Sequence, residues 1–380
     1  PSETPAMPSP VARRAFLGRS CGTVGSLAAV AAGAGPAGGF FIAGSDRLRV
    51  GLVGCGGRGT GAAAQAAAAD PAVRITALAD LFADRIDAAL TVLDRAAGAA
   101  VDCPADRRLL GEHGWRRLVE SDLDVVILAT SPDARPTQAV AAVAAGRHVY
   151  CEAPAAIDAA GVAAMHAAFR RAAEAGLSVG SGLAWRHDPA TVRAIATIRA
   201  GLIGPPIAAC AHSRIGPAWR AAGTSGRPAI AAAHRDWIAV PRLSGGDFVE
   251  HHVHAIDKLL WALGDEPPTV VEPLASGRGT AVRYRFAGGG VAEASLARLP
   301  GGRDRLQELV RGTRGGCDLR AAGGGAGRHA RSMAAFVRSI RGGPPAAEGE
   351  VLCRSTLAAI LGREAAATAA PLAWPAPLPA

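Results

Sequence analysis

The sequence predicts an α/β protein of two domains, a doubly wound parallel sheet followed by a second domain with a partly antiparallel sheet. Short apolar runs alternate with helix-compatible stretches from residue 47 to about residue 182. This alternation is typical of parallel strands joined by helices. With 380 residues, the chain is also longer than most single domains. Beyond residue 182 several strand-like runs follow without intervening helices, which indicates a change of architecture.

The first domain is expected to contain five strands separated by helices. The expected strands are 48–53, 73–79, 124–129, 148–151 and 177–180, and the main helices are 60–69, 82–97, 137–145 and 159–175. Residues 101–114 are expected to form a polar connection. Ligands of doubly wound sheets bind outside the carboxyl ends of the strands. This rule points to residues 54–59, Asp80, residues 130–133 including Thr130, and residues 152–154.

The first strand ends in a glycine-rich turn, Gly-Cys-Gly-Gly-Arg-Gly at residues 54–59. The spacing predicts a dinucleotide-binding βαβ unit, with the diphosphate at the N-terminus of the following helix. Gly54 permits the tight turn, Gly56 permits close approach of the pyrophosphate, and Gly59 permits close packing of helix and strand. Gly57 and Arg58 complete the turn. Arg58 either contacts the diphosphate or is solvated.

Asp80 ends the second expected strand, about twenty residues beyond the turn. There its carboxylate can accept hydrogen bonds from the ribose hydroxyls, which favours NAD over NADP. The alternative is a helix-capping role.

The second domain is expected to combine helices with a small sheet. We expect strands at 207–212, 269–271, 280–286 and 291–296, a loop at 213–235, and helices at 190–200, 328–340 and 350–367. Apolar residues at helical spacing predict a further helix through residues 249–263. Glu250, His254 and Asp257 would then share one face of that helix. A metal site formed by Glu250, His251, His252 and His254 is an alternative, but helical geometry opposes convergence of all four.

Composition limits the partners. The formal charge of +9 comes almost entirely from dispersed arginines, and no basic run with interleaved aromatics indicates nucleic-acid binding. Seven cysteines, none in a CxxC pair, are expected to be free thiols.

Residues 1–44 are expected to be a leader rather than part of the fold. Arg13 and Arg14 precede Phe16-Leu17 and a mildly apolar segment at 22–43, which resembles a twin-arginine export signal. We therefore expect recognition by the twin-arginine export machinery and a periplasmic or otherwise exported protein. An uncleaved leader would act as a membrane tether, and a disordered leader is the alternative.

The chain resembles the glucose-fructose oxidoreductase/inositol dehydrogenase/MocA (Gfo/Idh/MocA) family, and more narrowly its exported bacterial branch. The matching segments are 50–61, 124–130, 146–154, 185–189, 245–264 and 355–366. The resemblance implies a Rossmann domain at 45–182 and an α/β domain at 183–380 with an open, largely antiparallel sheet that supports homo-oligomers. It also implies NAD or NADP reacting with a sugar or cyclitol. The glycine-rich segment 287–327 suggests that this sheet is abbreviated.

Family roles transfer to individual residues with two departures. The family's Glu-Lys-Pro motif falls on Glu152-Ala153-Pro154, so the lysine beside the nicotinamide is absent; Lys258 is not expected to replace it. Asp133 stands where close relatives usually have histidine.

The family's acid and histidine pair falls on Glu250 and His254. His254 is the expected acid/base for a substrate hydroxyl, because an imidazole titrates near neutrality, and Glu250 holds the imidazole or binds the sugar. Arg186 and His187 match substrate-contacting positions, and Asp257 is assigned to the same group.

Three functions remain open. The first is a nicotinamide-dependent oxidoreductase acting on a sugar or cyclitol. The second is an NAD-dependent glycoside hydrolase of the same fold, because Glu-Ala-Pro-Ala-Ala at 152–156 resembles the lysine-free motif of such hydrolases. The third is a catalytically weakened nucleotide-binding or sugar-binding protein. The helix after Glu250 favours the oxidoreductase.

Overall fold

The computed structural model describes residues 47–217, 228–277, 279–299, 304–320 and 327–375. The expected twin-arginine leader lies outside the described residues. Within them, no helix has the length and apolar character needed to cross a membrane.

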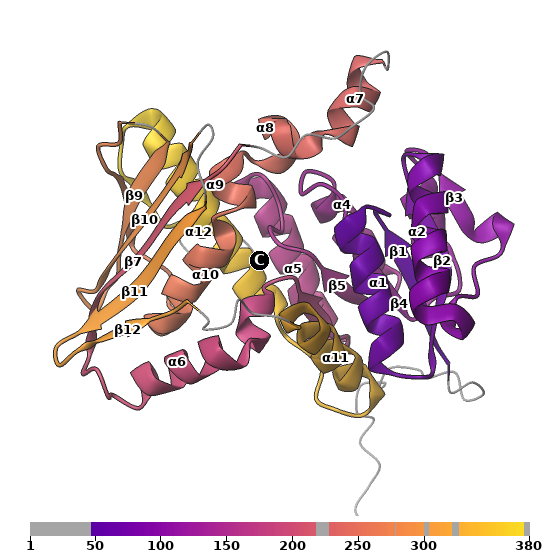
Figure 1. Cartoon of the computed structure of the whole chain (residues 1–380), viewed down its shortest axis with the longest axis horizontal. Helices are drawn as coiled ribbons and strands as arrows, with labels where there is room; N and C mark the ends of the chain where they lie inside the picture. Colours follow the sequence, from indigo (N-terminus) through magenta and orange to yellow (C-terminus); the bar gives the residue numbers. More distant parts are fainter. Residues whose placement is uncertain (1–46, 218–227, 278, 300–303, 321–326, 376–380) are drawn as a thin grey trace, which may run out of the picture. The chain divides into compact units, whose positions relative to one another are not determined.

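A six-stranded parallel sheet organises the first half of the chain (Figure 1). Its strand order is β3-β2-β1-β4-β5-β6, so the direction of winding reverses between β1 and β4. The strands are β1 (Leu48–Val53), β2 (Val73–Asp80), β3 (Arg108–Leu110), β4 (Val125–Leu128), β5 (His148–Cys151) and β6 (Val179–Ser181). This is the predicted doubly wound sheet, and the reversal between β1 and β4 creates the crevice in which such folds bind ligands.

The helices between these strands are α1 (Gly57–Ala69), α2 (Ala83–Ala97), α3 (Gly114–Glu120), α4 (Arg135–Ala144) and α5 (Ala159–Glu174). One expectation for this half was wrong. The connection at 101–114 contains the edge strand β3, which has only three residues and pairs with the end of β2. Such a short strand leaves no detectable alternation in the sequence.

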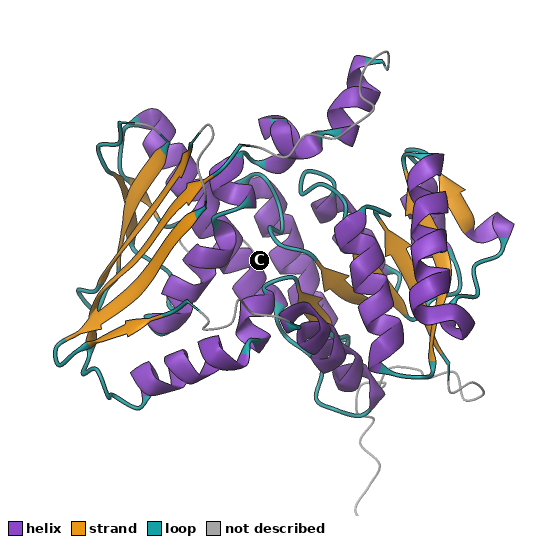
Figure 2. Cartoon of the chain, in the orientation of Figure 1, coloured by secondary structure: helices purple, strands orange, loops and turns teal. Residues whose placement is uncertain are grey.

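A seven-stranded sheet forms the second half, in the order β12-β11-β7-β10-β9-β8-β13. Among the described strands of this sheet, only β7 and β10 pair in parallel, so the sheet is largely antiparallel, as predicted. Helices α10 and α12 pack on one face, and Figure 2 shows no described helix over the other face. The strands are β7 (Pro206–Ile215), β8 (Val270–Pro273), β9 (Thr280–Arg285), β10 (Val291–Arg298), β11 (Arg305–Gly312), β12 (Gly316–Asp318) and β13 (Leu372–Ala373).

Two expectations for this half were wrong. The sheet is not abbreviated, because the glycine-rich segment contributes β11 and β12, and β11 buries every second residue from Glu308 onward. The expected loop at 213–235 begins with the end of β7 and ends with α7 (Ala229–Arg235). Glycine and arginine in these segments conceal the hydrophobic periodicity that would reveal a strand or helix.

The remaining helices are α6 (Pro189–Arg199), α8 (Pro241–Ser244), α9 (Asp247–Glu250), α10 (Val253–Ala262), α11 (Arg328–Arg341) and α12 (Gly349–Thr368). Helix α11 returns to the parallel sheet and packs on α1. There the Tyr150 and Phe336 rings meet at 5.4 Å between centroids, and the Tyr150 and Ser332 hydroxyls are 2.9 Å apart. Helix α11 therefore contributes side chains to the packing of the parallel-sheet half.

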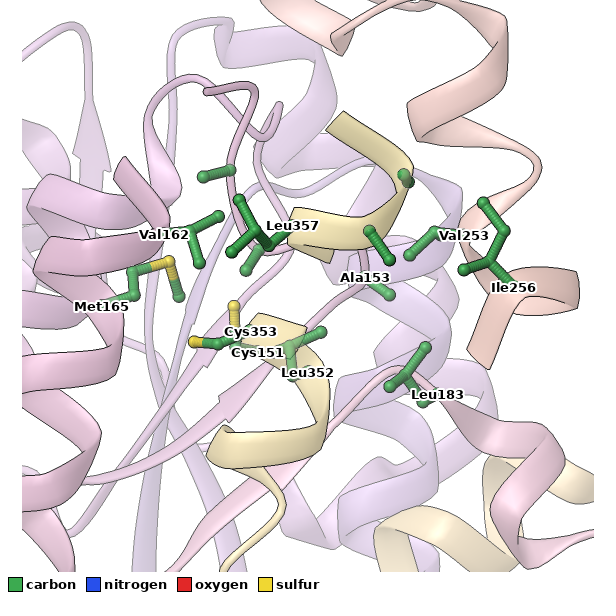
Figure 3. Packing of buried hydrophobic residues seen from close by; sticks show 14 of the residues in the cluster. Cys151, Ala153, Val162, Met165, Leu183, Val253, Ile256, Leu352, Cys353 and Leu357 are labelled. Carbon is green, nitrogen blue, oxygen red and sulfur yellow. The ribbon is translucent and has the colours of Figure 1, made fainter. Parts of the chain in front are cut away.

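The six described cysteines are all free thiols, as expected. Cys151 and Cys353 lie in the hydrophobic core between β5 and α12 (Figure 3). Burial raises the pKa of the Cys151 thiol to about 12, so this thiol stays protonated and serves packing.

Candidate functional site

The glycine turn has the geometry that a dinucleotide requires. Gly54 has φ +95°, and a Cβ atom there would lie 2.6 Å from the carbonyl carbon of Ala129. A Cβ atom on Gly59 would lie 1.9 Å from the carbonyl oxygen of Gly54, so only glycine allows α1 to pack this closely. By contrast, no atom lies within 4 Å of a Cβ built on Gly56 or Gly57. This open space at the start of α1 fits a pyrophosphate.

Asp80 is fastened to this turn by its carboxylate. Its Oδ2 accepts a hydrogen bond of 2.8 Å from the amide of Cys55, and its Oδ1 accepts one of 3.0 Å from the amide of Phe82. Burial raises the pKa of Asp80, and these two amides oppose the rise. Each carboxylate oxygen keeps a second lone pair, so Asp80 can hold the turn and still accept hydrogen bonds from a ribose.

Arg58 joins the glycine turn to the end of β5. Its Nε lies 3.0 Å from Oε1 of Glu152, and its guanidinium donates a 2.7 Å hydrogen bond to Gln65. Glu152 is 4% exposed. Burial raises its pKa, while Arg58 and Arg135 lower it. Arg58 therefore neutralises a buried carboxylate, a partner that sequence reasoning did not foresee.

Arg135 is a second site residue that sequence reasoning missed. It begins α4, is 3% exposed, and donates to the carbonyl oxygens of Glu152, at 3.1 Å, and Pro154. It thereby fixes the backbone after β5. Its position just beyond β4 was the available signal, since that segment follows a strand end. On the same connection, Thr130 donates a 2.7 Å hydrogen bond to Gln138 of α4.

The expected helix through residues 249–263 is broken at His251 and His252, between α9 and α10. His252 is buried, with Nδ1 3.2 Å from the Ser213 hydroxyl and Nε2 3.1 Å from the carbonyl oxygen of Ala211. His251 instead lies 3.6 Å from Asp247. The histidines thus diverge, and the described residues contain no group of three side chains suited to a metal ion.

The His254 imidazole was expected to titrate near neutral pH, but the pKa nearest neutrality belongs to Glu250. Burial raises the pKa of Glu250 to about 7, with Glu152 adding to the rise and Arg135 opposing it. Burial lowers the pKa of His254 to about 3, and the neighbouring His329 lowers it further. The group that titrates near neutral pH is therefore the carboxyl group.

Several polar atoms in this region are buried without a hydrogen-bond partner. They include Oε2 of Glu250, Nδ1 of His254, Nδ1 of His329 and Oδ1 of Asp133. Buried polar atoms are rarely unpaired, so such atoms suit a polar ligand. His329, at the start of α11, has a pKa lowered to about 4 by burial and by Arg58 and Arg328. Nothing in the local sequence indicated that His329 would approach His254.

The expected substrate residues Arg186 and Asp257 are bound to each other. The Arg186 guanidinium donates to Asp257 at 2.7 Å and to Asp265 at 2.7 Å. Asp257 is 1% exposed and also accepts a 2.8 Å hydrogen bond from Ser355. His187 lies 2.7 Å from Glu348. These side chains thus join η3 (Ala184–His187) to α10 and α12, while Glu250 and His254 keep unpaired atoms.

No ammonium group stands at the position of the family lysine. Ala153 is 7% exposed and lies among apolar side chains that include Val253 and Leu352 (Figure 3). Lys258, the one lysine in the sequence, is buried in an ion pair with Glu308, and its Nζ lies 4.4 Å from the Trp185 ring centre. The ionisable groups of the polar site are therefore carboxyl, imidazole and guanidinium groups.

The parallel sheet, the open glycine turn and Asp80 together define an NAD-binding Rossmann domain. Residues 48–181 match the model of the Gfo/Idh/MocA oxidoreductase family with an NAD-binding Rossmann fold. The match is confined to these residues, and NAD is the cofactor that the description of this family names.

Two curated relatives match parts of the chain. Glycosyl hydrolase family 109 protein 1 of Bacteroides thetaiotaomicron is 35% identical over 114 residues, which are 30% of this chain and 23% of that protein. Inositol 2-dehydrogenase of Cereibacter sphaeroides is 27% identical over 224 residues, 58% of this chain and 55% of that protein. The chain thus spans between about a quarter and about half of the length of these relatives.

The whole fold also has a solved counterpart. Scyllo-inositol dehydrogenase from Lactobacillus casei, with bound NAD(H) and scyllo-inositol, has a TM-score of 0.64 and 20% sequence identity, covering 86% of this chain and 99% of that chain. This likeness shows that both halves share a fold with that protein.

Proposed function

We propose that the chain is an NAD-dependent oxidoreductase that transfers a hydride between the cofactor and a carbon of a sugar or cyclitol. One observation carries this proposal: Glu250, four residues before His254 in the sequence, combines a pKa of about 7 with an unpaired, buried Oε2. A proton acceptor that titrates near the working pH is the group that oxidation of a hydroxyl requires. The inositol dehydrogenase relatives support the substrate class.

When bound, NAD supplies the hydride acceptor. The chain's own residues must then orient the substrate hydroxyl and remove its proton. Glu250 is half ionised near pH 7, so its carboxylate accepts the proton. His254, with a pKa of about 3, is neutral there and can hydrogen-bond the same hydroxyl through Nδ1. This division of roles reverses the one expected from sequence, in which His254 was the acid/base.

The positive groups around this pair have a separate task. Arg58 and Arg135 compensate the Glu152 carboxylate, and Arg328 lies close enough to His329 to lower its pKa. Glu152 is thus compensated by arginines, whereas Oε2 of Glu250 is buried without a hydrogen-bond partner. We therefore assign Glu152 to holding the cofactor turn and Glu250 to the reacting hydroxyl.

An NAD-dependent glycoside hydrolase is the second candidate. Two observations favour it: the lysine-free motif at 152–156, and the similarity to glycosyl hydrolase family 109 protein 1. In that reaction a sugar hydroxyl is oxidised, a proton is lost from the adjacent carbon and the aglycone leaves by elimination. Water is then added and the carbonyl is reduced, so the cofactor ends unchanged. A weakened binding protein is the third candidate.

The deciding experiment uses the purified full chain. Mass spectrometry first identifies the nucleotide released on denaturation, and a panel of sugars, cyclitols and aryl glycosides is then added with NAD. We expect a substrate-dependent rise in NADH absorbance that is about 10²- to 10⁴-fold slower in Glu250→Gln. Release of aglycone at constant NADH would replace this proposal with the hydrolase, and bound nucleotide with neither signal would replace it with the binding protein.

We also propose that the protein is exported by the twin-arginine route and assembles as a homo-oligomer. Arg13 and Arg14 support export, and the face of the seven-stranded sheet without a described helix supports assembly. Loss of export in an Arg13→Lys/Arg14→Lys variant and a multiple of the monomer mass in light scattering are the expected results. Unchanged export and a monomer mass would contradict them.

A further inference from the structure

Arg235 ties the C-terminal half of the chain to the start of α2. Its guanidinium donates two hydrogen bonds to Asp84, of 2.8 and 2.7 Å, in a bidentate pair. In return, Arg85 donates a 2.9 Å hydrogen bond to the carbonyl oxygen of Arg235. The contact spans 151 residues of sequence and joins α7 to α2, both labelled in Figure 1.

The same guanidinium stacks on an aromatic ring. The Cζ atom of Arg235 lies 4.3 Å from the centre of the Phe82 ring, and the Cζ atom of Arg85 lies 5.1 Å from it. The Arg235 side chain is 10% exposed, whereas that of its partner Asp84 is 62% exposed. Arginine is rarely this buried unless it is paired. Its buried Nε still has no hydrogen-bond partner.

This cluster adjoins the ribose-binding acid. Phe82 follows Asp80 by two residues, and its amide is held by the Asp80 carboxylate. The charge of Asp80 contributes to raising the pKa of Arg235, so the two groups are close. Adenine is bonded directly to the ribose that Asp80 would hold. Side chains beside Asp80 are therefore placed where they can line the adenine.

We propose that Arg235 is a positioning residue for the adenosine half of NAD: pinned by Asp84, it holds the Phe82 ring and the α7 segment as a wall of the adenine site. This inference rests on the NAD binding in the proposed function. It adds a residue from the C-terminal half that retains the cofactor at the end remote from the reacting carbon.

The wall explains how the two halves can share one cofactor. A stacked guanidinium and ring would shield the adenine from water, and an Arg-aromatic contact strengthens when it is desolvated. The bidentate pair to Asp84 fixes the plane of the guanidinium, which lysine could not do.

The test measures binding of ADP-ribose, which needs no turnover. We expect Arg235→Ala to raise the Kd for ADP-ribose about tenfold and to leave binding of nicotinamide mononucleotide unchanged. Arg235→Lys should give most of the same loss, since it keeps the charge but not the planar fork. Asp84→Asn alters an exposed side chain on α2, so it should fold normally and produce a smaller loss. Arg283→Ala, which breaks the ion pair with Glu293 on the other sheet, is the matched control and should change nothing.

Four results would overturn the proposal. Unchanged ADP-ribose affinity in both the Arg235 and Asp84 variants would show that the contact is purely structural. Tighter binding in Arg235→Ala would show that Arg235 obstructs the site. A loss confined to 2′-phospho-ADP-ribose would make Arg235 a phosphate-recognition residue. Failure of the parent protein to bind ADP-ribose would refute the NAD-dependent function as well, whereas the other three results would leave that function standing.

Discussion

The two sides of the site are built in different ways. The cofactor side is made of backbone: Gly54 and Gly59 leave no room for a side chain, and residues 56–57 leave open space. The proposed reacting side is made of ionisable side chains: Glu250, His254 and His329 come from three helices, and burial is the main cause of their pKa shifts. One contiguous segment is enough for the first side, whereas the second exists only after distant helices have packed.

This difference separates what each side tolerates. A substitution in the turn acts through steric overlap, whatever its charge. A substitution in the charged cluster can keep the shape of the side chain and still change the chemistry. A glycine-to-alanine substitution therefore tests the cofactor side, and an isosteric substitution such as Glu250→Gln tests the reacting side.

The largest effect is expected on the charged side. Glu250→Gln keeps the shape but removes the proton acceptor, so kcat/KM should fall about 10²- to 10⁴-fold. In the parent protein, the active form is the carboxylate, so the rate should rise with pH up to about 7 and then level off. Steady-state assays between pH 5 and 9 measure both effects.

That pH dependence also discriminates between Glu250 and His254. A rise near pH 7 that persists in Glu250→Gln would assign the titration to another group. Glu250→Asp serves as the control, because it keeps an ionisable group and should retain part of the rate together with the rise.

A smaller effect is expected on the backbone side. Gly59→Ala places a methyl group against the Gly54 carbonyl oxygen, so α1 must move. We expect the free energy of unfolding to fall by about 2–3 kcal/mol and NAD affinity to fall with it. Gly57→Ala meets no atom within 4 Å and is the matched control, with a change in unfolding free energy below about 0.5 kcal/mol. Urea titrations measure the free energy of unfolding of the two variants. Equal losses in both variants would contradict the packing role of Gly59.

The smallest effect is expected at Asp80, whose charged carboxylate is hydrogen-bonded to the backbone of the glycine turn. Asp80→Ala removes a carboxylate that can bind the ribose diol, so the Kd for NAD should rise about tenfold. NADP should lose less, because its 2′-phosphate no longer faces a negative charge. Calorimetric titration with each dinucleotide measures the ratio, and an unchanged preference for NAD would contradict the assigned role.

Much of the first half could be predicted from sequence because its signals are local. Strands, helices and turn follow one another with little interruption, and residues within one strand or turn determine each feature. The edge strand β3 was missed because three residues carry no periodicity. In the second half, β11 was missed because its burial runs against its sequence pattern: Leu306 and Leu309 are exposed, whereas Glu308 is buried. The break between α9 and α10 coincides with the hydrogen bonding of His252 to β7.

The sequence by itself determined the parallel sheet, the glycine turn with Asp80, and Glu250 and His254 as candidate reactive groups. Only the tertiary structure decided which of the two titrates near neutral pH, because burial and neighbouring charges set a pKa and neither is written in local sequence. It also decided that Arg58 pairs with Glu152, that His329 approaches His254, and that Arg235 lies beside Asp80. Each of these pairs joins segments far apart in the chain, and long-range packing alone brings them together.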